Sequence, residues 1–217
     1  RDFGSSESLS AGRLVGNSSS RLFGNAEYHP RKDVTLNAGF YLDRDQWSGT
    51  SFSPRIGANW AVTPEHTVRV GWATGTRRPD LQEQQGNWTY AMSGATPTIP
   101  GVAKPYFYQT ALARGGLVPE RNSRIEVGYY GNLMSRNLTA DVVVFREHLR
   151  DLISEKLSIS SFVPTNGGRS ENSGLESEIR YVYSASLQLG AGGAWIRSTA
   201  NNSLELAQYS SLSGFAH

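Results

Sequence analysis

Three observations in the sequence predict an all-β protein, an antiparallel transmembrane β-barrel. Apolar and polar residues alternate with a period of two through most of the chain, which is the pattern of pleated strands. The connections between these strands are alternately short and long along the chain. The composition is polar, with a mean hydropathy of −0.43, yet it is rich in aromatic residues and glycine. Together these features favour a barrel with a thin apolar outer face and a wet interior.

The clearest strands lie in the stretch Ser53–Glu83, where two alternating runs flank a turn at 63–66. Pro64 favours the turn because its φ is fixed and it has no N–H for a ladder. Each run approaches the 9–11 residues that a tilted strand needs to cross a bilayer. One face is apolar and carries Ile56, Ala58, Trp60, Val62, Val68, Val70, Trp72 and Thr74. The other face carries Arg55, Gly57, Asn59, Ala61, Arg69, Gly71, Ala73 and Gly75, so we expect it to meet water or a polar body.

Six further runs alternate in the same way, which brings the expected number of strands to about eight. They are Arg21–His29, Asp33–Asp43, Arg124–Gly131, Leu138–Glu147, Gly174–Tyr183 and Leu187–Trp195. Large aromatic residues near the strand ends are typical of the belt at a membrane surface. These are Tyr28, Trp60, Trp72, Tyr183 and Trp195.

The connections between the runs are sorted by length. Short ones lie near 30–33, 63–66, 132–137 and 184–186, and longer ones near 44–52, 77–121, 150–172 and after Arg197. Short turns at one rim and long loops at the other are typical of outer-membrane barrels, whose long loops face outside. A soluble β-sandwich is the alternative fold, but it has no reason to sort its loops by rim.

Several functions find no support in the sequence. The net charge of +2, without any run of Lys or Arg, predicts no nucleic-acid partner. Thiolate catalysis is excluded because there is no cysteine, and the four histidines lack the spacing of metal ligands. No nucleophile elbow and no phosphate loop are present. We therefore expect no enzyme activity, no catalytic residue, no metal and no cofactor.

Two groups of residues are candidates for binding. The long connection between 77 and 120 is the default binding loop, because a neutral connection has no need of that length. Its candidates are Arg77, Arg78, Trp88, Tyr90, Tyr106, Phe107 and Tyr108. The aromatic rings would stack on flat ligand groups, or else pack the loop on itself or lie at the headgroup level. The arginines would attract an anion, or else pair with Asp80 or Glu83. The second group would line the interior: Arg55, Arg69, Glu126, Asp141, Glu176, Glu178 and Arg180.

A series of short phrases between Ser20 and Arg197 resembles the barrel domain of TonB-dependent outer-membrane receptors. Each phrase is weakly specific, but their order and spacing match that family. They are FSPR at 52–55, WAVTP at 60–64, TRRPDL at 76–81, LVPE at 117–120, EVG at 126–128, FRE at 145–147, DLI at 151–153 and NSGLE at 172–176.

This resemblance implies a larger barrel of roughly 22 strands, of which residues 1–217 would be a part, without a plug domain or a TonB box. It implies a bacterial outer-membrane receptor that imports a ligand, most often a ferric siderophore, in a TonB-dependent way. The interior group would then face the plug. The implied partners are the siderophore or a similar small ligand, outer-membrane lipid and lipopolysaccharide, and the TonB complex acting through the missing plug segment.

Two alternatives remain open at this stage. The chain would also fit a complete small outer-membrane barrel with a structural or adhesive role and no transport. The many glycines of the polar face would fill the interior of such a barrel poorly. A more distant alternative is an outer-membrane hydrolase.

Overall fold

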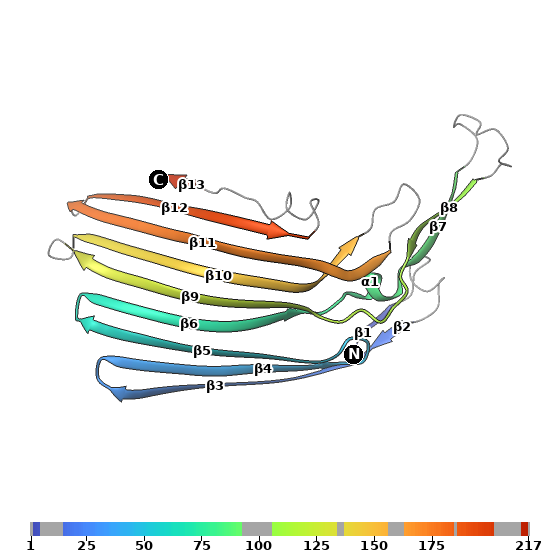
Figure 1. The fold of residues 1–217 in the computed structure, drawn as a ribbon, viewed down its shortest axis with the longest axis horizontal. Helices are drawn as coiled ribbons and strands as arrows, with labels where there is room; N and C mark the ends of the chain where they lie inside the picture. The colour runs from blue at the N-terminus through green and yellow to red at the C-terminus, as the bar shows by residue number, and fades with distance from the viewer. Residues whose placement is uncertain are drawn as a thin grey trace.

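The computed structural model describes residues 2–4, 15–92, 106–133, 137–155, 163–184, 186–201 and 214–216. Its main feature is a sheet of eight long antiparallel strands that lie side by side (Figure 1), with a ninth short strand at one edge. The sheet order is β13-β12-β11-β10-β9-β6-β5-β4-β3. The long strands are β3 (Ser19–Arg31), β4 (Val34–Asp45), β5 (Gly49–Thr63), β6 (His66–Arg77), β9 (Glu120–Leu133), β10 (Leu138–Glu155), β11 (Pro164–Ser184) and β12 (Leu187–Ala200).

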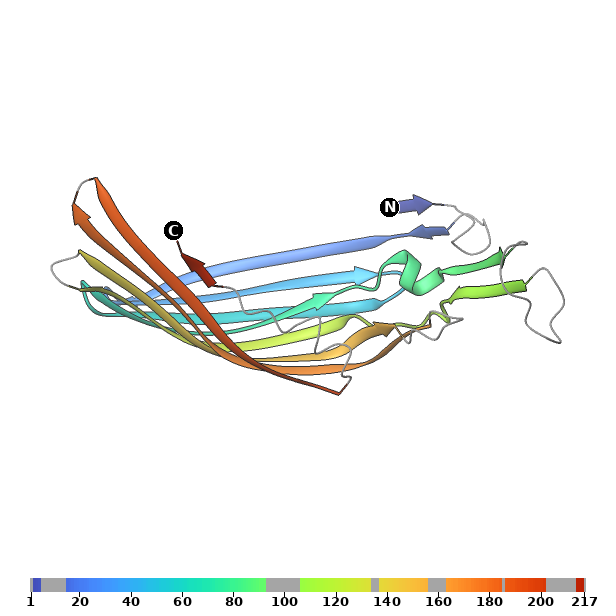
Figure 2. The same cartoon turned by 90° about the horizontal axis from the view of Figure 1, so that it is seen from above.

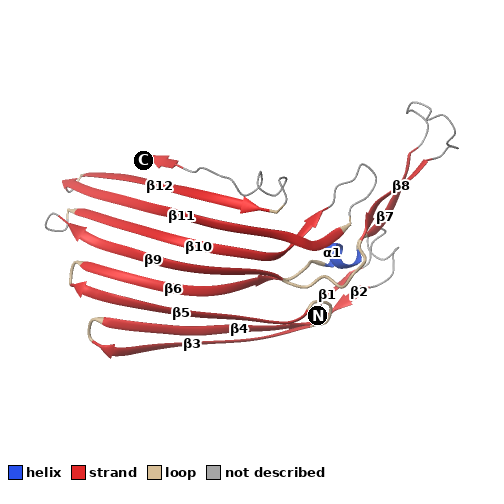
Figure 3. Ribbon diagram, viewed as in Figure 1, coloured by secondary structure: helices blue, strands red, loops and turns tan. Residues whose placement is uncertain are grey.

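Only small elements stand outside the long strands (Figure 3). β13 (Gly214–Ala216) pairs with three residues of β12. Two short hairpin-like pairs form sheets of their own, β1 (Asp2–Gly4) with β2 (Val15–Asn17) and β7 (Asn87–Met92) with β8 (Tyr106–Leu112). The helix α1 (Leu81–Gln85) precedes β7. Over the described part of the chain, no helix has the length and apolar character to cross a membrane.

The long sheet is curved like a trough, as the view in Figure 2 shows. The register confirms the predicted face assignment, because Ala58, Val70, Val127, Val144 and Leu175 pair in one unbroken row from β5 to β11. Side chains of this face are open, with Val70 at 47% and Val144 at 55% exposure. On the opposite face Val143 and Phe145 are buried at 9% and 5%. On a curved sheet, side chains crowd together on the concave face and spread apart on the convex face. These exposures therefore indicate that the polar face is the concave one.

The tight turns gather at one end of the sheet, as predicted. β5 and β6 are joined by Pro64 and Glu65 alone, and β3 and β4 by Lys32 and Asp33. At the turn between β3 and β4, the hydrogen bond from Arg31 lowers the pKa of Asp33 to about 2. The ionised carboxylate also accepts a hydrogen bond from Trp60 Nε1 at 3.0 Å, which ties the outer aromatic residue to the turn.

Two of the predicted long connections at the opposite end are shorter in the structure. The expected loop at 44–52 is a three-residue turn, Gln46–Ser48, because Asp45 accepts hydrogen bonds from the backbone of Trp47 and Ser48, both at 3.0 Å. The expected loop at 150–172 is largely strand, since β10 continues to Glu155 and β11 begins at Pro164. The start of β11 is polar on both faces, and register shifts between Leu149 and Ser154 interrupt the end of β10, so the alternation that marks a membrane strand is lost there. Part of the predicted 150–172 loop lies outside the described residues.

Candidate ligand-binding site

The predicted irregular loop between β6 and β9 is a structured arm. Asp80 caps α1 in a reciprocal box with Glu83, with both hydrogen bonds at 2.7 Å. Immediately after the helix, the Ala113 N–H donates to the Gly86 carbonyl at 2.7 Å. The two roots of the β7–β8 pair therefore lie side by side, and the arm projects past the ends of the long strands (Figure 1).

Arg77 holds the base of this arm against the sheet. Its guanidinium group forms ion pairs with Glu120 at 2.6 Å and with Glu83 at 3.0 Å. Glu120 also accepts a hydrogen bond from the Ile153 backbone at 2.8 Å, so the cluster joins α1, β9 and β10. The hydrogen bonds with Glu120 raise the pKa of Arg77 above its usual range. Of the two roles expected for Arg77, attraction of an anion or pairing with a neighbouring acid, the structure shows the second, with Glu83 as the acid.

Arg78 is held by two buried carboxylates on the other side of the arm. It pairs with Asp43 at 2.9 Å and with Asp45 at 2.8 Å, and both acids have side chains about 5% exposed or less. Burial favours a raised pKa for Asp45, but hydrogen bonds from Ser48, Asn17 and the Trp47 backbone lower its pKa below the usual value. Asp45 is therefore ionised and Arg78 supplies its counter-charge.

Two amides complete the attachment of the arm. Buried Gln84 donates to the Leu117 carbonyl at 2.9 Å and accepts from the Leu117 N–H at 3.3 Å. Asn166 of β11 makes the same pair of bonds with Val118, both at 2.9 Å. Sequence reasoning missed both amides. The one available signal was the capping box, Asp80 with Glu83, which predicts a helix start next to Gln84.

The seven loop candidates thus fall into two groups. Arg77 and Arg78 lie at the base of the arm, each engaged with two carboxylates. The five aromatic candidates belong to the arm itself: Trp88 and Tyr90 to β7, and Tyr106, Phe107 and Tyr108 to β8. The backbone register pairs Tyr90 with Tyr108 and Trp88 with Ala111. Their side chains lie outside the described residues.

The interior candidates do lie on the concave face, and several pair across strands. Arg69 of β6 reaches over β9 to Asp141 of β10, with the shortest contact at 2.7 Å. Gly128 lies between them, and a Cβ there would stand 2.5 Å from Arg69 Nε. A side chain on residue 128 would therefore force Arg69 off this path. Arg55 donates to Asn25 Oδ1 at 3.1 Å, which Gly39 permits in the same way.

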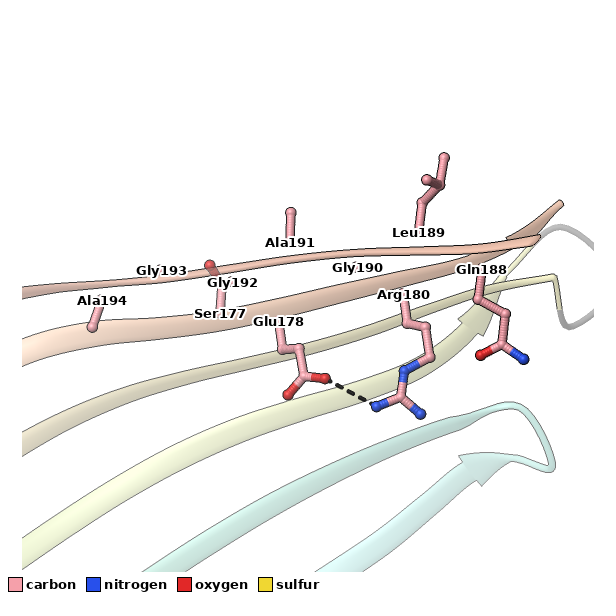
Figure 4. A pocket seen from close by; sticks show the side chains of 10 residues that line it. All are labelled: Ser177, Glu178, Arg180, Gln188, Leu189, Gly190, Ala191, Gly192, Gly193 and Ala194. Atoms are coloured by element: carbon pink, nitrogen blue, oxygen red, sulfur yellow. Dashed lines mark hydrogen bonds and ion pairs between the residues drawn. The ribbon is translucent and has the colours of Figure 1, made fainter. Parts of the chain in front are cut away.

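Arg124 is the interior residue that the candidate group omitted. It pairs with Glu126 at 2.9 Å and Glu176 at 3.6 Å, and it lies 4.0 Å from the centre of the Phe145 ring. Its position two residues before Glu126 placed it on the polar face. Glu178 and Arg180 form an exposed pair at 3.3 Å, pointing away from Leu189 and Ala191 (Figure 4). Among the described residues, no group of three or more His, Cys, Asp or Glu side chains could hold a metal ion.

Arg78→Ala is expected to destabilise the arm base by about 3 kcal/mol, because it leaves buried Asp45 without its counter-charge and leaves Asp43 with only the more distant Arg21, at 3.6 Å. Arg180→Ala is the matched control. Its ion pair is more than 60% exposed on both sides, so its loss should cost less than about 1 kcal/mol. The midpoint of urea unfolding of the refolded full-length protein measures both. Equal effects of the two substitutions would mean that Arg78 has no anchoring role.

The comparisons with known proteins agree with this geometry. The family model described as "TonB dependent receptor-like, beta-barrel" matches residues 3–214. An iron-regulated outer membrane virulence protein of Vibrio cholerae is 35% identical over 68 residues, which are 31% of this chain and 10% of that protein.

Solved structures with the same fold include the siderophore receptor PirA from Pseudomonas aeruginosa (TM-score 0.71, 17% identity). They also include the ferric enterobactin receptor PfeA (TM-score 0.68, 17% identity). The chain matches these structures over 88% and 89% of its own length but only 36% and 29% of theirs. It thus spans about a third of each receptor. The family match covers nearly all of the chain, so it belongs to the TonB-dependent receptor β-barrel family, which consists of transport receptors of the bacterial outer membrane.

Proposed function

We propose that this chain forms part of the barrel of a receptor that imports a ferric siderophore in a TonB-dependent way. The observation that carries the proposal is the anchored arm, which places five aromatic residues beyond the end of the membrane strands. Aromatic rings suit the flat, partly apolar groups of an iron chelate. The similar structures include a siderophore receptor and a ferric enterobactin receptor, which supports the same ligand class.

Within this proposal the two arginines position the arm, and the aromatic residues contact the ligand. Arg77 and Arg78 together face four carboxylates, those of Asp43, Asp45, Glu83 and Glu120. With Arg21 at 3.6 Å from Asp43, four carboxylates still outnumber three arginines in these ion pairs. An anionic chelate would have to displace carboxylates to reach Arg77 or Arg78. The proposal therefore assigns capture of the ligand to the arm and positioning of the arm to its base. With these roles, no carboxylate has to be displaced.

The rest of the barrel is proposed from the sheet edges. Over the described residues, β3 has no partner on its second edge and β12 has one over only three residues. Unpaired backbone groups are very costly in lipid, so we infer that further strands of the receptor complete these edges. Among the described residues, the first and last long strands, β3 and β12, do not pair with each other. The eight long strands therefore do not close on themselves, which disfavours the complete small barrel. The concave wall of Arg55, Arg69, Arg124 and their polar and acidic partners would face a plug that TonB displaces.

The test is iron uptake by the full-length receptor in cells that lack other siderophore receptors. Radioactive iron is supplied with one siderophore at a time, with and without a functional TonB protein. We expect at least one siderophore to deliver iron only when both the receptor and TonB are present. Uptake that is absent for every chelate, or independent of TonB, would reject the proposal.

A further inference from the structure

Two pairs of short strands lie at the end of the long sheet that is opposite to the two-residue turns. They are the β1–β2 pair and the β7–β8 arm (Figure 1 and Figure 2). β1 and β2 pair over three residues and form a sheet of their own. A two-stranded pair is at best marginally stable in water when it stands alone. The position of the β1–β2 pair therefore depends on the contacts that β2 makes at its root.

The root of β2 is attached to the turn between β4 and β5. The indole N–H of Trp47 in this turn donates to the Gly16 carbonyl at 3.0 Å. The next residue of β2, Asn17, donates from its side chain to Asp45 at 2.8 Å. Asp45 is the last residue of β4, so its side chain lies at the junction of β2 and the turn.

The two oxygens of the Asp45 carboxylate serve different neighbours. Oδ1 accepts hydrogen bonds from the backbone N–H groups of Trp47 and Ser48, both at 3.0 Å, and so shapes the turn. Oδ2 accepts from Asn17 of β2 and from Arg78 at the base of the arm, both at 2.8 Å. The side chain is 4% exposed, and charge-assisted hydrogen bonds are strong where water is excluded. A single buried oxygen atom thus joins β2 to the base of the arm.

Asp43 offers an internal comparison two residues earlier on the same strand. It is also buried, and it pairs with the same guanidinium group of Arg78, at 2.9 Å. Its other ion pair, with Arg21 at 3.6 Å, leads to β3. Among the described residues, the ion pairs of Asp43 therefore supply charge to Arg78 without reaching β2.

We propose that Asp45 is a positioning residue that couples the β1–β2 pair to the base of the β7–β8 arm, so that both are held as one preorganised unit. A rim that is ordered before the ligand arrives loses less conformational entropy when the ligand binds. This coupling rests on the proposed function only in treating the arm as the element that captures the ligand. Asp45 itself is buried and acts through Asn17 and Arg78.

The experiment measures amide hydrogen exchange by mass spectrometry in the full-length receptor, without any ligand. Peptides that cover β1 and β2 report on the coupling. Asp45→Asn places an NH₂ group where Oδ2 faces Arg78, and it keeps an oxygen for the turn. Asp43→Asn is the matched control, because it removes the same charge beside the same arginine. A heat-dependent gel shift verifies that each barrel is assembled.

We expect Asp45→Asn to speed exchange in β1 and β2 about 10-fold, and Asp43→Asn to change it less than about 3-fold. Arg78→Gln should have the effect of Asp45→Asn, although residue 78 reaches β2 through Asp45. The double variant Asp45→Asn/Arg78→Gln should exchange little faster than either single variant, because both substitutions remove the same bond. If Asp45→Asn does not assemble, Arg78→Gln compared with Asp43→Asn decides the question.

A swap of the two side chains tests whether the contact itself is responsible. Asn17→Asp/Asp45→Asn again sets a carboxylate against an amide beside Arg78, so it should restore most of the protection lost in Asp45→Asn. Equal effects of Asp43→Asn and Asp45→Asn would overturn the coupling role and leave only a charge requirement at Arg78. Exchange of β1 and β2 in the wild type as fast as in an unfolded chain would also overturn it. Since no ligand is present, these outcomes do not depend on what the receptor imports.

Discussion

Removal of the β7–β8 arm is expected to lower siderophore uptake by at least ~100-fold while the barrel still assembles, because a few aromatic anchors usually supply most of the binding energy. The structure makes a clean deletion possible. Gly86 and Ala113 are already paired at 2.7 Å, so Asn87–Leu112 can be replaced by an Asn-Gly turn that closes on the same hydrogen bond. Radioactive iron uptake and surface display of the full-length receptor are measured together.

The matched comparison keeps the arm and changes its rings. Alanine at Trp88, Tyr90, Tyr106 and Tyr108, one at a time, should weaken binding by ~1 kcal/mol or more for each ring that contacts the ligand. Wild-type uptake by the arm deletion would remove the arm from the binding site. Lost display of the deletion variant would instead show that the arm is needed for assembly, and the four single variants then decide its role in binding.

Val70→Arg is expected to destabilise the barrel by about 2–4 kcal/mol, because the apolar row through Val70 would face lipid near the bilayer midplane. Thr67→Arg adds the same side chain three residues away, on the concave face that carries Arg69. It should cost less than about 1 kcal/mol, since that face meets water or a polar body.

Unfolding of the full-length protein in lipid vesicles measures the free-energy change for both substitutions. A larger penalty at Thr67 than at Val70 would reverse the assignment of the two faces.

The membrane part of the fold could be predicted from the sequence because its rule is simple. Lipid on one face and water on the other impose a period of two, and residues such as Ile56, Val70 and Val127 follow it. The strand ends near Glu155 and Pro164 could not be predicted in this way. The start of β11 is polar on both faces, and register shifts between Leu149 and Ser154 break the alternation of β10, so the ladder hydrogen bonds there leave no trace in the hydropathy pattern.

The candidate site was predicted in type but not in arrangement. The aromatic residues between 88 and 108 were recognised as a binding segment from their composition and the length of the connection. The ion pairs of Arg78 with Asp43 and Asp45 join residues more than 30 positions apart, and nothing local signals them. Arg124 lay within reach of prediction, because it shares the alternation that identified Glu126.

Cysteine labelling of whole cells tests the central claim, that this chain is a section of an outer-membrane barrel with its arm outside. The chain has no cysteine of its own, so single cysteines can be introduced at Arg114 and Gly167 near the arm and at Lys32 and Glu65 in the two-residue turns. Lys32, Arg114 and Gly167 are exposed, and Glu65 is half-exposed. An impermeant thiol reagent should label residues 114 and 167 on intact cells, and residues 32 and 65 only after the outer membrane is opened. Labelling of residues 32 and 65 on intact cells, with 114 and 167 protected, would contradict the account.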